Sequence, residues 1–490
     1  MKYVTCEEFV SIRKKLKKQG LKIVHCHGVF DLLHPGHIAH FEEAKRQGDI
    51  LVISVTSAKY VKKMPGRPYF SDELRIKSLI SLSFVDYVLL SESITAIDMI
   101  EVIRPDYYVK GSEYKISEND ITQNIDVEIE KVRSYGGNVY FTSDNVVFSS
   151  TKLLNNNFSS LSTEYLKEFS NQFSFEQVKN IIDNIKNIKI LVVGDIIIDE
   201  YIFCNVQGLI SKDRALSGRY LKEERYFGGS LAVANHLSGL CDNVTICSMI
   251  GEEPNILNNI HVNKELIVDK NYKTTIKRRY IEKHGMREDY DKLFSINYFN
   301  ENNFDKSAFS KKLLKIIHNY DLVVVTDYGH GLIDSKIIDI LQNNSKFLAV
   351  NCQTNSSNYG LNLITKYNNV NLFSVDEKEL KLVGGDLQEL MIKLNAQIGW
   401  ETKGSNGAIG ATNYNDLYCV PALTLTVQDT IGAGDAFYSL VAACSYLNAP
   451  FEISTFLGSI AGAMISNVLG NSKSINKIDL LKFASTVMNI

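Results

Sequence analysis

Short apolar segments alternate with amphipathic segments over two long stretches of this chain of 490 residues. From residue 21 to about 155, runs with the length and composition of strands stand between segments whose apolar residues recur at helical spacing. The strand candidates are 21–26, 50–55, 85–90, 106–110 and 138–143, and the helix candidates are 37–48, 71–82, 95–103 and the region after 121. Strands that alternate with helices predict a parallel sheet covered by helices.

A second alternation of the same kind starts at residue 188 with IKILVVGD and ends in an apolar helical region. Between the two, residues 156–186 are polar, rich in Asn and Ser, and helical in spacing, and they contain no strand candidate. We therefore predict an α/β protein with a domain at 1–155, a helical linker at 156–186 and a second domain at 187–490. A chain of this length agrees with more than one domain, because one domain usually takes about 100–200 residues.

The composition is that of an ordinary globular chain, with 45% hydrophobic and 22% charged residues. The net charge of -3 gives no electrostatic attraction for nucleic acid or an anionic membrane, so it favours a small-molecule substrate. No secretory signal opens the chain, and no run reaches about 18 apolar residues. The eight cysteines form no CxxC pair, so we expect reduced thiols and a cytoplasmic protein.

Five of the ten histidines lie in HCHGVFDLLHPGHIAH, which follows a predicted strand and opens a predicted helix. A helix N-terminus presents free N–H groups and partial positive charge, and the Pro35-Gly36 step lets the backbone approach a phosphate chain. There His34 and His37 can donate to phosphate oxygens during phosphoryl or nucleotidyl transfer, with Lys45 reaching back from two turns along the helix. A histidine metal site is the weaker alternative, because the Glu of HExxH is missing.

The segment HGVFDLLHPGHIAHFEEAKRQGD resembles the signature of the cytidylyltransferase-like nucleotidyltransferases, which have a Rossmann-like fold. Further matches are GRP at 66–68, Arg75, PDYYVKGSEY at 105–114 and FSST at 148–151. Two departures are Asp144 and Val147, which stand where many members carry an arginine and a glycine.

The resemblance implies a role for each matching residue of the first domain. The backbone of Gly28, Val29 and Phe30 would contact the nucleotide, and His34 and His37 would stabilise the α-phosphate. Lys45 and Arg75 would hold the triphosphate. The late match would cap a helix onto the triphosphate tail through Ser149, Ser150 and Thr151.

The segment DTIGAGD at 429–435 stands between a strand-like LTLTV and an apolar helical segment. The small residues Gly432, Ala433 and Gly434 leave backbone N–H groups free to converge on an anion, and the following helix adds its dipole. A carboxylate at that point would be repelled by phosphate, so Asp435 is a candidate general base for a hydroxyl that attacks the γ-phosphate of ATP. The alternative is a glycine-containing helix cap with Asp435 as an N-terminal charge.

This segment resembles the second signature of the ribokinase-like (PfkB) sugar kinases. The remaining matches are VVGDIIIDEY at 192–201, FGGS at 227–230, TDYGHG at 326–331, SVDEKE at 374–379 and ETKGSNG at 401–407. Polar strand-like segments at 209–227 and 274–291 match the small β lid of that fold.

The resemblance implies sugar contacts from Asp199, Gly228 and Gly229. It also implies that Asp376 and Glu379 organise magnesium and phosphate, and that Thr402 and Gly404 flank the nucleotide together with the Gly432–Gly434 turn. Lid arginines would either meet a phosphorylated sugar or face solvent; these are Arg278, Arg279 and Arg287.

Three departures leave the sugar open. No Asn follows Gly228-Gly229 within four residues, His330 stands where close relatives have lysine, and the segment after Ile250 is short and polar.

Two signatures in one chain suggest consecutive steps, in which a sugar is phosphorylated and its phosphate is then coupled to a nucleotide. The pairing resembles the bifunctional heptose-phosphate kinase/adenylyltransferases of lipopolysaccharide synthesis, in inverted domain order. We expect Mg²⁺ in both sites, ATP in the kinase site, ATP or CTP as nucleotidyl donor, a sugar phosphate such as heptose 7-phosphate, and a homo-oligomer.

Two alternatives stay open: a cytidylyltransferase for a polyol or other small phosphate with a different kinase substrate, and a second domain kept only for binding or oligomerisation. A dehydrogenase is disfavoured because neither first strand is followed by GxGxxG.

Overall fold

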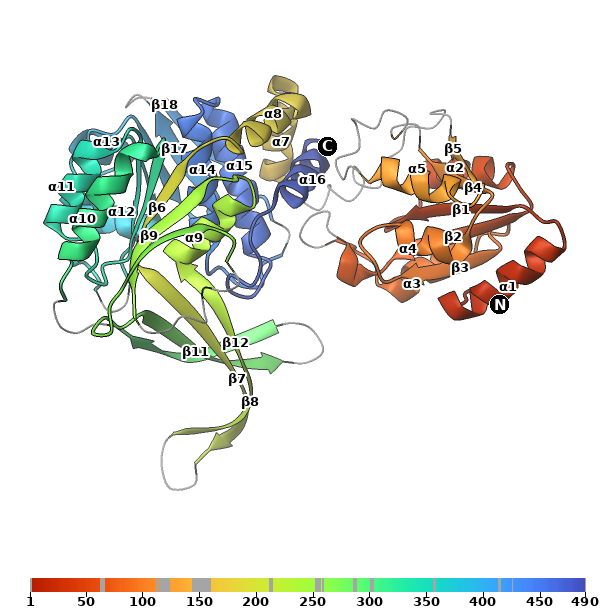
Figure 1. Ribbon diagram of the computed structural model, residues 1–490, viewed down its shortest axis with the longest axis horizontal. Coiled ribbons are helices and arrows are strands. Elements are labelled where there is room, and N and C mark those ends of the chain that lie inside the picture. The colour runs from red at the N-terminus through yellow and green to blue at the C-terminus, as the bar shows by residue number, and fades with distance from the viewer. Residues whose placement is uncertain are drawn as a thin grey trace. The chain divides into compact units, whose positions relative to one another are not determined.

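The computed structural model forms two compact units (Figure 1). Unit 1 comprises residues 1–159 and 481–490, and unit 2 comprises residues 160–480. The structure describes residues 2–61, 67–111, 114, 124–142, 160–210, 215–251, 257, 260–284, 289–299, 304–355, 358–412, 416–424 and 426–489.

Unit 1 is built on a parallel sheet of five strands in the order β3-β2-β1-β4-β5. The strands are β1 (Ile23–Gly28), β2 (Ile50–Thr56), β3 (Tyr87–Ser91), β4 (Tyr107–Lys110) and β5 (Asn138–Phe141). The helices are α1 (Cys6–Lys18), α2 (Pro35–Lys45), α3 (Asp72–Ile80), α4 (Ile97–Ile103) and α5 (Ile125–Arg133), with a 3₁₀ turn η1 (Ala58–Tyr60).

The alternation along β1 explains why helices cover both faces of this sheet. Val24 and Cys26 belong to a core cluster with Phe41 of α2, whereas Ile23 belongs to a second cluster with Phe9 of α1. Successive side chains of a strand point to opposite faces, so each face requires its own cover. The strand order places the carboxyl end of β1, next to the start of α2, in the middle of the sheet edge.

Unit 2 contains a nine-stranded sheet in the order β10-β9-β6-β13-β14-β15-β16-β17-β18. All pairs are parallel except those that join β17 to its two neighbours. The strands are β6 (Ile190–Gly194), β9 (Val244–Ile250), β10 (Asn263–Val268), β13 (Leu322–Asp327), β14 (Leu348–Cys352), β15 (Leu372–Asp376), β16 (Ile398–Thr402), β17 (Ala408–Thr412) and β18 (Asp416–Val420).

Helices cover this sheet and position the glycine turn predicted at 432–434. They are α7 (Ser160–Gln172), α8 (Phe175–Ile185), α9 (Ser230–Ser238), α10 (Ser307–Ile316), α11 (Ser335–Asn344), α12 (Glu377–Val383), α13 (Leu387–Lys393), α14 (Ala433–Tyr446) and α15 (Phe451–Ile465). Three 3₁₀ turns are η5 (Ile317–Asn319), η6 (Ile364–Lys366) and η7 (Gly404–Asn406), and α16 (Lys477–Met488) follows α15.

A separate four-stranded sheet, which we call the lid sheet, has the order β12-β11-β7-β8. Its strands are β7 (Ile196–Leu209), β8 (Leu216–Gly229), β11 (Thr275–His284) and β12 (Asp289–Tyr298). In Figure 1 these strands project from the α/β body of unit 2. The predicted fold class, two α/β parts with a small β lid on the second, is confirmed.

Three details differ from the sequence-based expectation. The N-terminal helix α1 was not predicted, although Thr5 and Glu8 form a capping box at its start. The run VVGDIIIDEY is two strands, because Asp195 ends β6 in the large sheet and β7 then begins in the lid sheet. In the segment predicted as a linker, α7 and α8 pack within unit 2, where the ring of Phe169 stacks on Phe456 at 4.1 Å.

Candidate functional sites

The start of α2 brings His34 and His37 together in unit 1. His34 is the N-cap residue and Pro35 follows at the first helical position, where its missing N–H costs nothing. The backbone N–H of His37 donates to His34 Nδ1 at 3.4 Å, and the two imidazole rings stack at 3.8 Å. Burial lowers the pKa of His34, so this ring is neutral at pH 7. The structure thus places two imidazoles at a helix N-terminus, as predicted.

The loop at Gly28–Phe30 is held in one conformation beside these histidines. Phe30 has φ 47°, and its ring lies against His37 at 5.4 Å and Phe41 at 5.0 Å. A Cβ on Gly28 would lie 2.8 Å from the Phe30 ring, so only glycine fits that position. A loop fixed in this way can present its backbone to a ligand, as expected for Gly28, Val29 and Phe30.

Arg75 is paired within the protein in this structure. Its guanidinium donates to three backbone carbonyls, those of Val29 at 2.6 Å, Thr56 at 2.9 Å and Phe70 at 3.2 Å, and it also pairs with Asp72 at 2.5 Å. The side chain is fully buried. Arg75 thus holds the loop after β1, and the triphosphate contact that the resemblance implies for it stays a prediction.

Lys45 is likewise paired within the protein, and its predicted triphosphate role stays a prediction. It is the last residue of α2, at the opposite end from His34. Its Nζ donates to the Asp49 carbonyl and pairs with Asp86 Oδ2, both at 2.5 Å. The prediction assumed that Lys45 reaches back along the helix, but the partner that holds it lies at the start of β3 and is distant in sequence.

Asp31 was not predicted as a site residue, yet it connects the loop after β1 to the segment at 67–70 before α3. Its carboxylate accepts the N–H groups of Tyr69 at 2.8 Å and Phe70 at 2.9 Å, and it pairs with Arg67 at 3.3 Å. The only sequence signal was its place within the signature, between Phe30 and His34.

The other described histidines of the cluster are structural, as expected for His25 and His40. His25 and His27 both contact Ser54 Oγ at 2.7 Å, and His40 contacts Thr142 Oγ1 at 3.0 Å. Burial lowers the pKa of His27 to about 3 and that of His40 to about 4. Among the residues that the structure describes, no group of three His, Cys, Asp or Glu side chains could hold a metal ion.

Several predicted positions lie outside the described residues. They are Gly66, Asp144, Val147, Ser149, Ser150, Thr151 and Arg287. The roles that the resemblance implies for them stay predictions.

In unit 2 a cleft of about 1050 Å³ opens where the carboxyl ends of the central strands meet the lid sheet. This is the edge at which parallel α/β sheets bind ligands. The cleft is lined by ten of the predicted residues: Asp199, Gly229, Asp376, Glu379, Thr402, Gly404, Gly432, Ala433, Gly434 and Asp435.

Asp435 lies in the first turn of α14 and is buried. Tyr328 Oη donates to its Oδ1 at 2.8 Å, and Gln353 Nε2 donates to the same oxygen at 3.0 Å. Burial raises the pKa of Asp435 to about 6; the charge of Asp199 adds to the rise, and the two hydrogen bonds and Lys277 oppose it. A carboxylate with this pKa is ionised at pH 7 and basic enough to accept a proton.

The turn before Asp435 can accept an anion. Gly432 is the N-cap of α14 with φ 84°, and a Cβ there would lie 1.9 Å from Asn471 Oδ1. A Cβ on Gly434 would meet nothing within 4 Å. The turn therefore needs glycine at Gly432 for its backbone, and the space beside Gly434 is open for a phosphate at the helix N-terminus.

Asp199 of β7 lies in the cleft and is already paired. Arg279 of β11 donates to its Oδ1 at 2.5 Å, and a Cβ on Gly228 would lie 2.5 Å from its Oδ2. Gly229, with φ 58°, caps α9. Gly228 thus makes room for Asp199, whereas a Cβ on Gly229 would lie 2.5 Å from the Asp195 carbonyl oxygen; the sequence alone indicated neither contact.

Asp376 and Glu379 form a capping box at the start of α12. Glu379 N–H donates to Asp376 Oδ1 at 2.7 Å, and Asp376 N–H donates to Glu379 Oε2 at 2.8 Å. Burial, with the charge of Asp376, raises the pKa of Glu379 to about 8. Mg²⁺ usually binds one or two carboxylates, waters and substrate phosphates. The exposed Asp376 at the cleft fits such a site, and the buried Glu379 holds its loop.

The lid arginines divide between two faces. Arg279 and its neighbour Lys277 line the cleft, whereas Arg278 pairs with Glu200 at 2.7 Å outside it. Tyr328, Gln353 and Lys277 were missed by sequence reasoning, although DYG at 327–329 directly follows a predicted strand. In α9, the residues Ser230–Ala234 are buried and provide no counterpart to the missing Asn.

Comparison with known proteins agrees with this two-part organisation. Residues 25–160 match the model of the cytidylyltransferase-like family, and residues 187–477 match that of the pfkB family carbohydrate kinases. Within the described residues, no helix is long and apolar enough to cross a membrane.

Curated relatives carry the name "Bifunctional protein HldE". The protein of Koribacter versatilis is 35% identical over 155 residues, which are 31% of this chain and 30% of the relative. That of Nitratiruptor sp. is 40% identical over 124 residues, 24% of this chain and 27% of the relative. The chain thus covers less than a third of the length of these relatives. Phosphofructokinase-2 from Escherichia coli in complex with potassium covers 61% of this chain and 99% of its own, at 16% identity and a TM-score of 0.48.

Proposed function

We propose, from the premise that the chain belongs to the pfkB carbohydrate kinase family, that it is a bifunctional enzyme of nucleotide-sugar synthesis. The second domain, at 187–490, would phosphorylate a sugar with ATP. The first domain, at 1–155, would join the resulting sugar phosphate to a nucleotide and release pyrophosphate. A heptose 7-phosphate phosphorylated at O1 is the first substrate to test, because the sequence resembles the bifunctional heptose-phosphate kinase/adenylyltransferases.

In the kinase step Asp435 takes the proton of the sugar hydroxyl. The hydroxyl oxygen forms a bond to the γ-phosphorus of ATP, the bond from that phosphorus to the β,γ-bridging oxygen breaks, and ADP leaves. The backbone N–H groups at the N-terminus of α14, Gly432–Gly434, would stabilise the charge on the phosphoryl group while it passes from ATP to the sugar. Mg²⁺, held near Asp376, would supply charge neutralisation for the phosphates.

In the transferase step an oxygen of the sugar 1-phosphate attacks the α-phosphorus of ATP or CTP, and pyrophosphate leaves. His34 and His37 donate hydrogen bonds to the oxygens on which charge develops. A neutral imidazole is a suitable donor there, and burial keeps His34 neutral. Lys45 and Arg75 have partners within the protein, and the resemblance implies that they would hold the triphosphate.

The observation that carries the proposal is the position of Asp435. A buried carboxylate with a raised pKa stands next to an open glycine turn in a cleft, and a simple helix-capping charge needs neither the cleft nor the raised pKa. Eight unpaired cysteines and the use of ATP favour the cytoplasm, and we expect a homo-oligomer.

The test is product analysis by mass spectrometry after incubation of the full chain with Mg²⁺, ATP or CTP, and a panel of sugars and sugar phosphates. We expect sugar-dependent ADP and a nucleotide sugar with pyrophosphate. Turnover with CTP and a polyol phosphate alone would replace the sugar assignment by the cytidylyltransferase alternative. Pyrophosphate release without any sugar-dependent ADP would make the second domain a binding or oligomerisation module.

A further inference from the structure

Two donors from neighbouring strand ends hold the same oxygen of Asp435. Tyr328 Oη lies 2.8 Å and Gln353 Nε2 3.0 Å from Oδ1. Within the described part of the chain, no donor is hydrogen-bonded to Oδ2. We propose that Tyr328 and Gln353 are positioning residues that reserve Oδ2 of Asp435 for the substrate hydroxyl. This inference rests on the proposed kinase function.

Tyr328 is held in place by hydrogen bonds to its backbone and by burial of its side chain. It follows β13, its backbone N–H donates to Asp195 Oδ2 at 3.2 Å, and its carbonyl accepts the side-chain amides of Asn355 and Asn358 at 2.9 Å each. Its side chain is 3% exposed. The hydroxyl therefore has little freedom to leave Asp435.

Gln353 follows β14 and is anchored through its backbone. Its N–H donates to the Asp327 carbonyl at 2.8 Å, and its carbonyl accepts from Asn362 Nδ2 at 3.0 Å. Within α14, Ser439 Oγ donates to the backbone carbonyl of Asp435 at 2.7 Å. The chain segments after β13 and β14 thus each supply one donor to the same carboxylate oxygen of Asp435.

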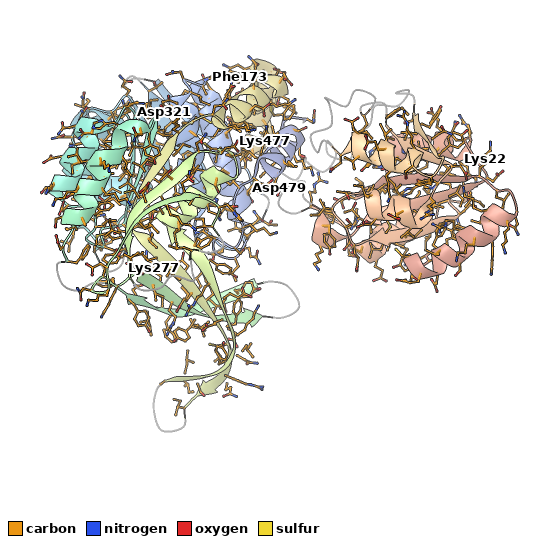
Figure 2. The ribbon with its side chains drawn as sticks, in the orientation of Figure 1. Lys22, Phe173, Lys277, Asp321, Lys477 and Asp479 are labelled. Carbon is orange, nitrogen blue, oxygen red and sulfur yellow. The ribbon has the colours of Figure 1, made fainter. Side chains whose placement is uncertain are left out.

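The lid sheet contributes a charge to the same group. Lys277 of β11 lines the cleft, and its Nζ lies 5.4 Å from the centre of the Tyr328 ring, a cation–π distance. Figure 2 labels Lys277 where the lid strands meet the body of unit 2. The charged groups that act on the Asp435 site are therefore Asp199 from β7, Lys277 and Arg279 from β11, Asp195 after β6 and Glu379 from α12.

Hydrogen bonds to the ionised form of an acid lower its pKa. In Asp435 the bonds from Tyr328 and Gln353 oppose the rise caused by burial and by Asp199, and the resulting pKa is about 6. Removing a donor must raise this pKa. The base would then be protonated over a wider pH range, and kinase activity would be lost first on the acid side.

The experiment compares Tyr328→Phe, Gln353→Leu and the wild-type full chain in kcat/KM for sugar-dependent ADP formation from pH 5 to 9. We expect the acid limb of Tyr328→Phe to move up by about one pH unit and that of Gln353→Leu by less. At pH values above the acid limbs of both proteins, the activity of Tyr328→Phe should recover toward the wild-type value.

The matched control is Tyr438→Phe, which removes a buried hydroxyl that bonds the Val325 carbonyl at 3.0 Å. Like Tyr328→Phe, this variant loses a buried hydrogen bond, but the lost bond does not reach Asp435. The acid limb of its kcat/KM profile should therefore stay at the wild-type pH. A fall in activity of Tyr328→Phe that is equal at all pH values, as a structural defect would give, would overturn the proposal.

A second readout does not require turnover. Carbon-13 NMR of aspartate-labelled chain, with Asp435→Asn to assign the signal, follows the Asp435 carboxyl directly. We expect a midpoint near 6 in the wild type and a higher one in Tyr328→Phe. Identical midpoints would overturn the positioning role. If the Asp435 midpoint rose in Tyr328→Phe as expected but the wild type formed no sugar-dependent ADP, only the proposed kinase function would be overturned.

Discussion

Each unit places a helix N-terminus near the carboxyl ends of parallel strands, but the two helix ends carry opposite chemistry. The start of α2 carries the stacked imidazoles of His34 and His37, and burial keeps His34 neutral. The start of α14 carries glycines and the carboxylate Asp435, whose pKa burial raises to about 6. The helix dipole favours anions at both ends, so it does not by itself explain the difference.

The difference between the two helix ends follows from the nucleophile of each proposed reaction. A sugar phosphate is already an anionic nucleophile, so the transferase site needs only donors for the charge that develops on phosphorus oxygens. A sugar hydroxyl must lose its proton, so the kinase site needs a base. A carboxylate beside a phosphate site is tolerable when Tyr328 and Gln353 hold it and Lys277 balances its charge.

The largest effect is expected for Asp435→Asn, which should impair the site at the start of α14 and not the site at the start of α2. Asp435→Asn should lower kcat for sugar-dependent ADP formation by about 10²–10⁴, because a general base contributes a factor of that size. Pyrophosphate release with a preformed sugar 1-phosphate should be unchanged. An equal loss in both assays would mean that the variant damages the whole chain and that the two centres are not separate.

Substitution of His34 gives the reciprocal effect. His34→Asn keeps a good helix cap while removing the imidazole, and His34→Ala removes both. We expect both to lower pyrophosphate release by about 10²–10³, the size found when one donor to a developing oxyanion is lost. ADP formation serves as the internal control. If His34→Asn retained full pyrophosphate release, His34 would be only a cap.

Arg75→Met tests whether Arg75 stabilises unit 1. It leaves three backbone carbonyls, one buried and two partly buried, without their donor, so we expect unit 1 to lose about 3 kcal/mol of stability. Hydrogen exchange of unit 1 amides, followed by mass spectrometry, measures this. Unchanged exchange together with a raised KM for the nucleoside triphosphate would support the triphosphate role.

The smallest effect is expected for Lys45→Met. The ion pair of Lys45 with Asp86 is about a third exposed on both sides, and such pairs contribute about 0–1 kcal/mol. The KM for the nucleotidyl donor should change by less than about threefold, because the lysine lies at the far end of α2. A tenfold rise would show that Lys45 does reach the triphosphate.

Sequence analysis could predict those site residues whose surroundings are formed by their neighbours in the chain. His34, His37 and Gly432–Asp435 lie at the start of a helix, and their neighbours in the chain reveal that setting; the strand predicted before Gly432 is not formed by the described residues of LTLTV, because β18 ends at Val420. The structural partners of Lys45 and Arg75, Asp86 and the Val29 carbonyl, could not be predicted, because they are 41 and 46 residues away. Tyr328 and Gln353 were missed because they meet Asp435 only when β13, β14 and α14 are brought together.

The most direct test of the account is a phosphorus-31 NMR time course of the His34→Asn variant with Mg²⁺, ATP and the sugar substrate identified by the product analysis. The two-centre account predicts that a sugar 1-phosphate and ADP accumulate while pyrophosphate and nucleotide sugar stay near background. A variant that formed no phosphorylated sugar, although the wild type makes the nucleotide sugar, would contradict separate kinase and transferase centres in one chain.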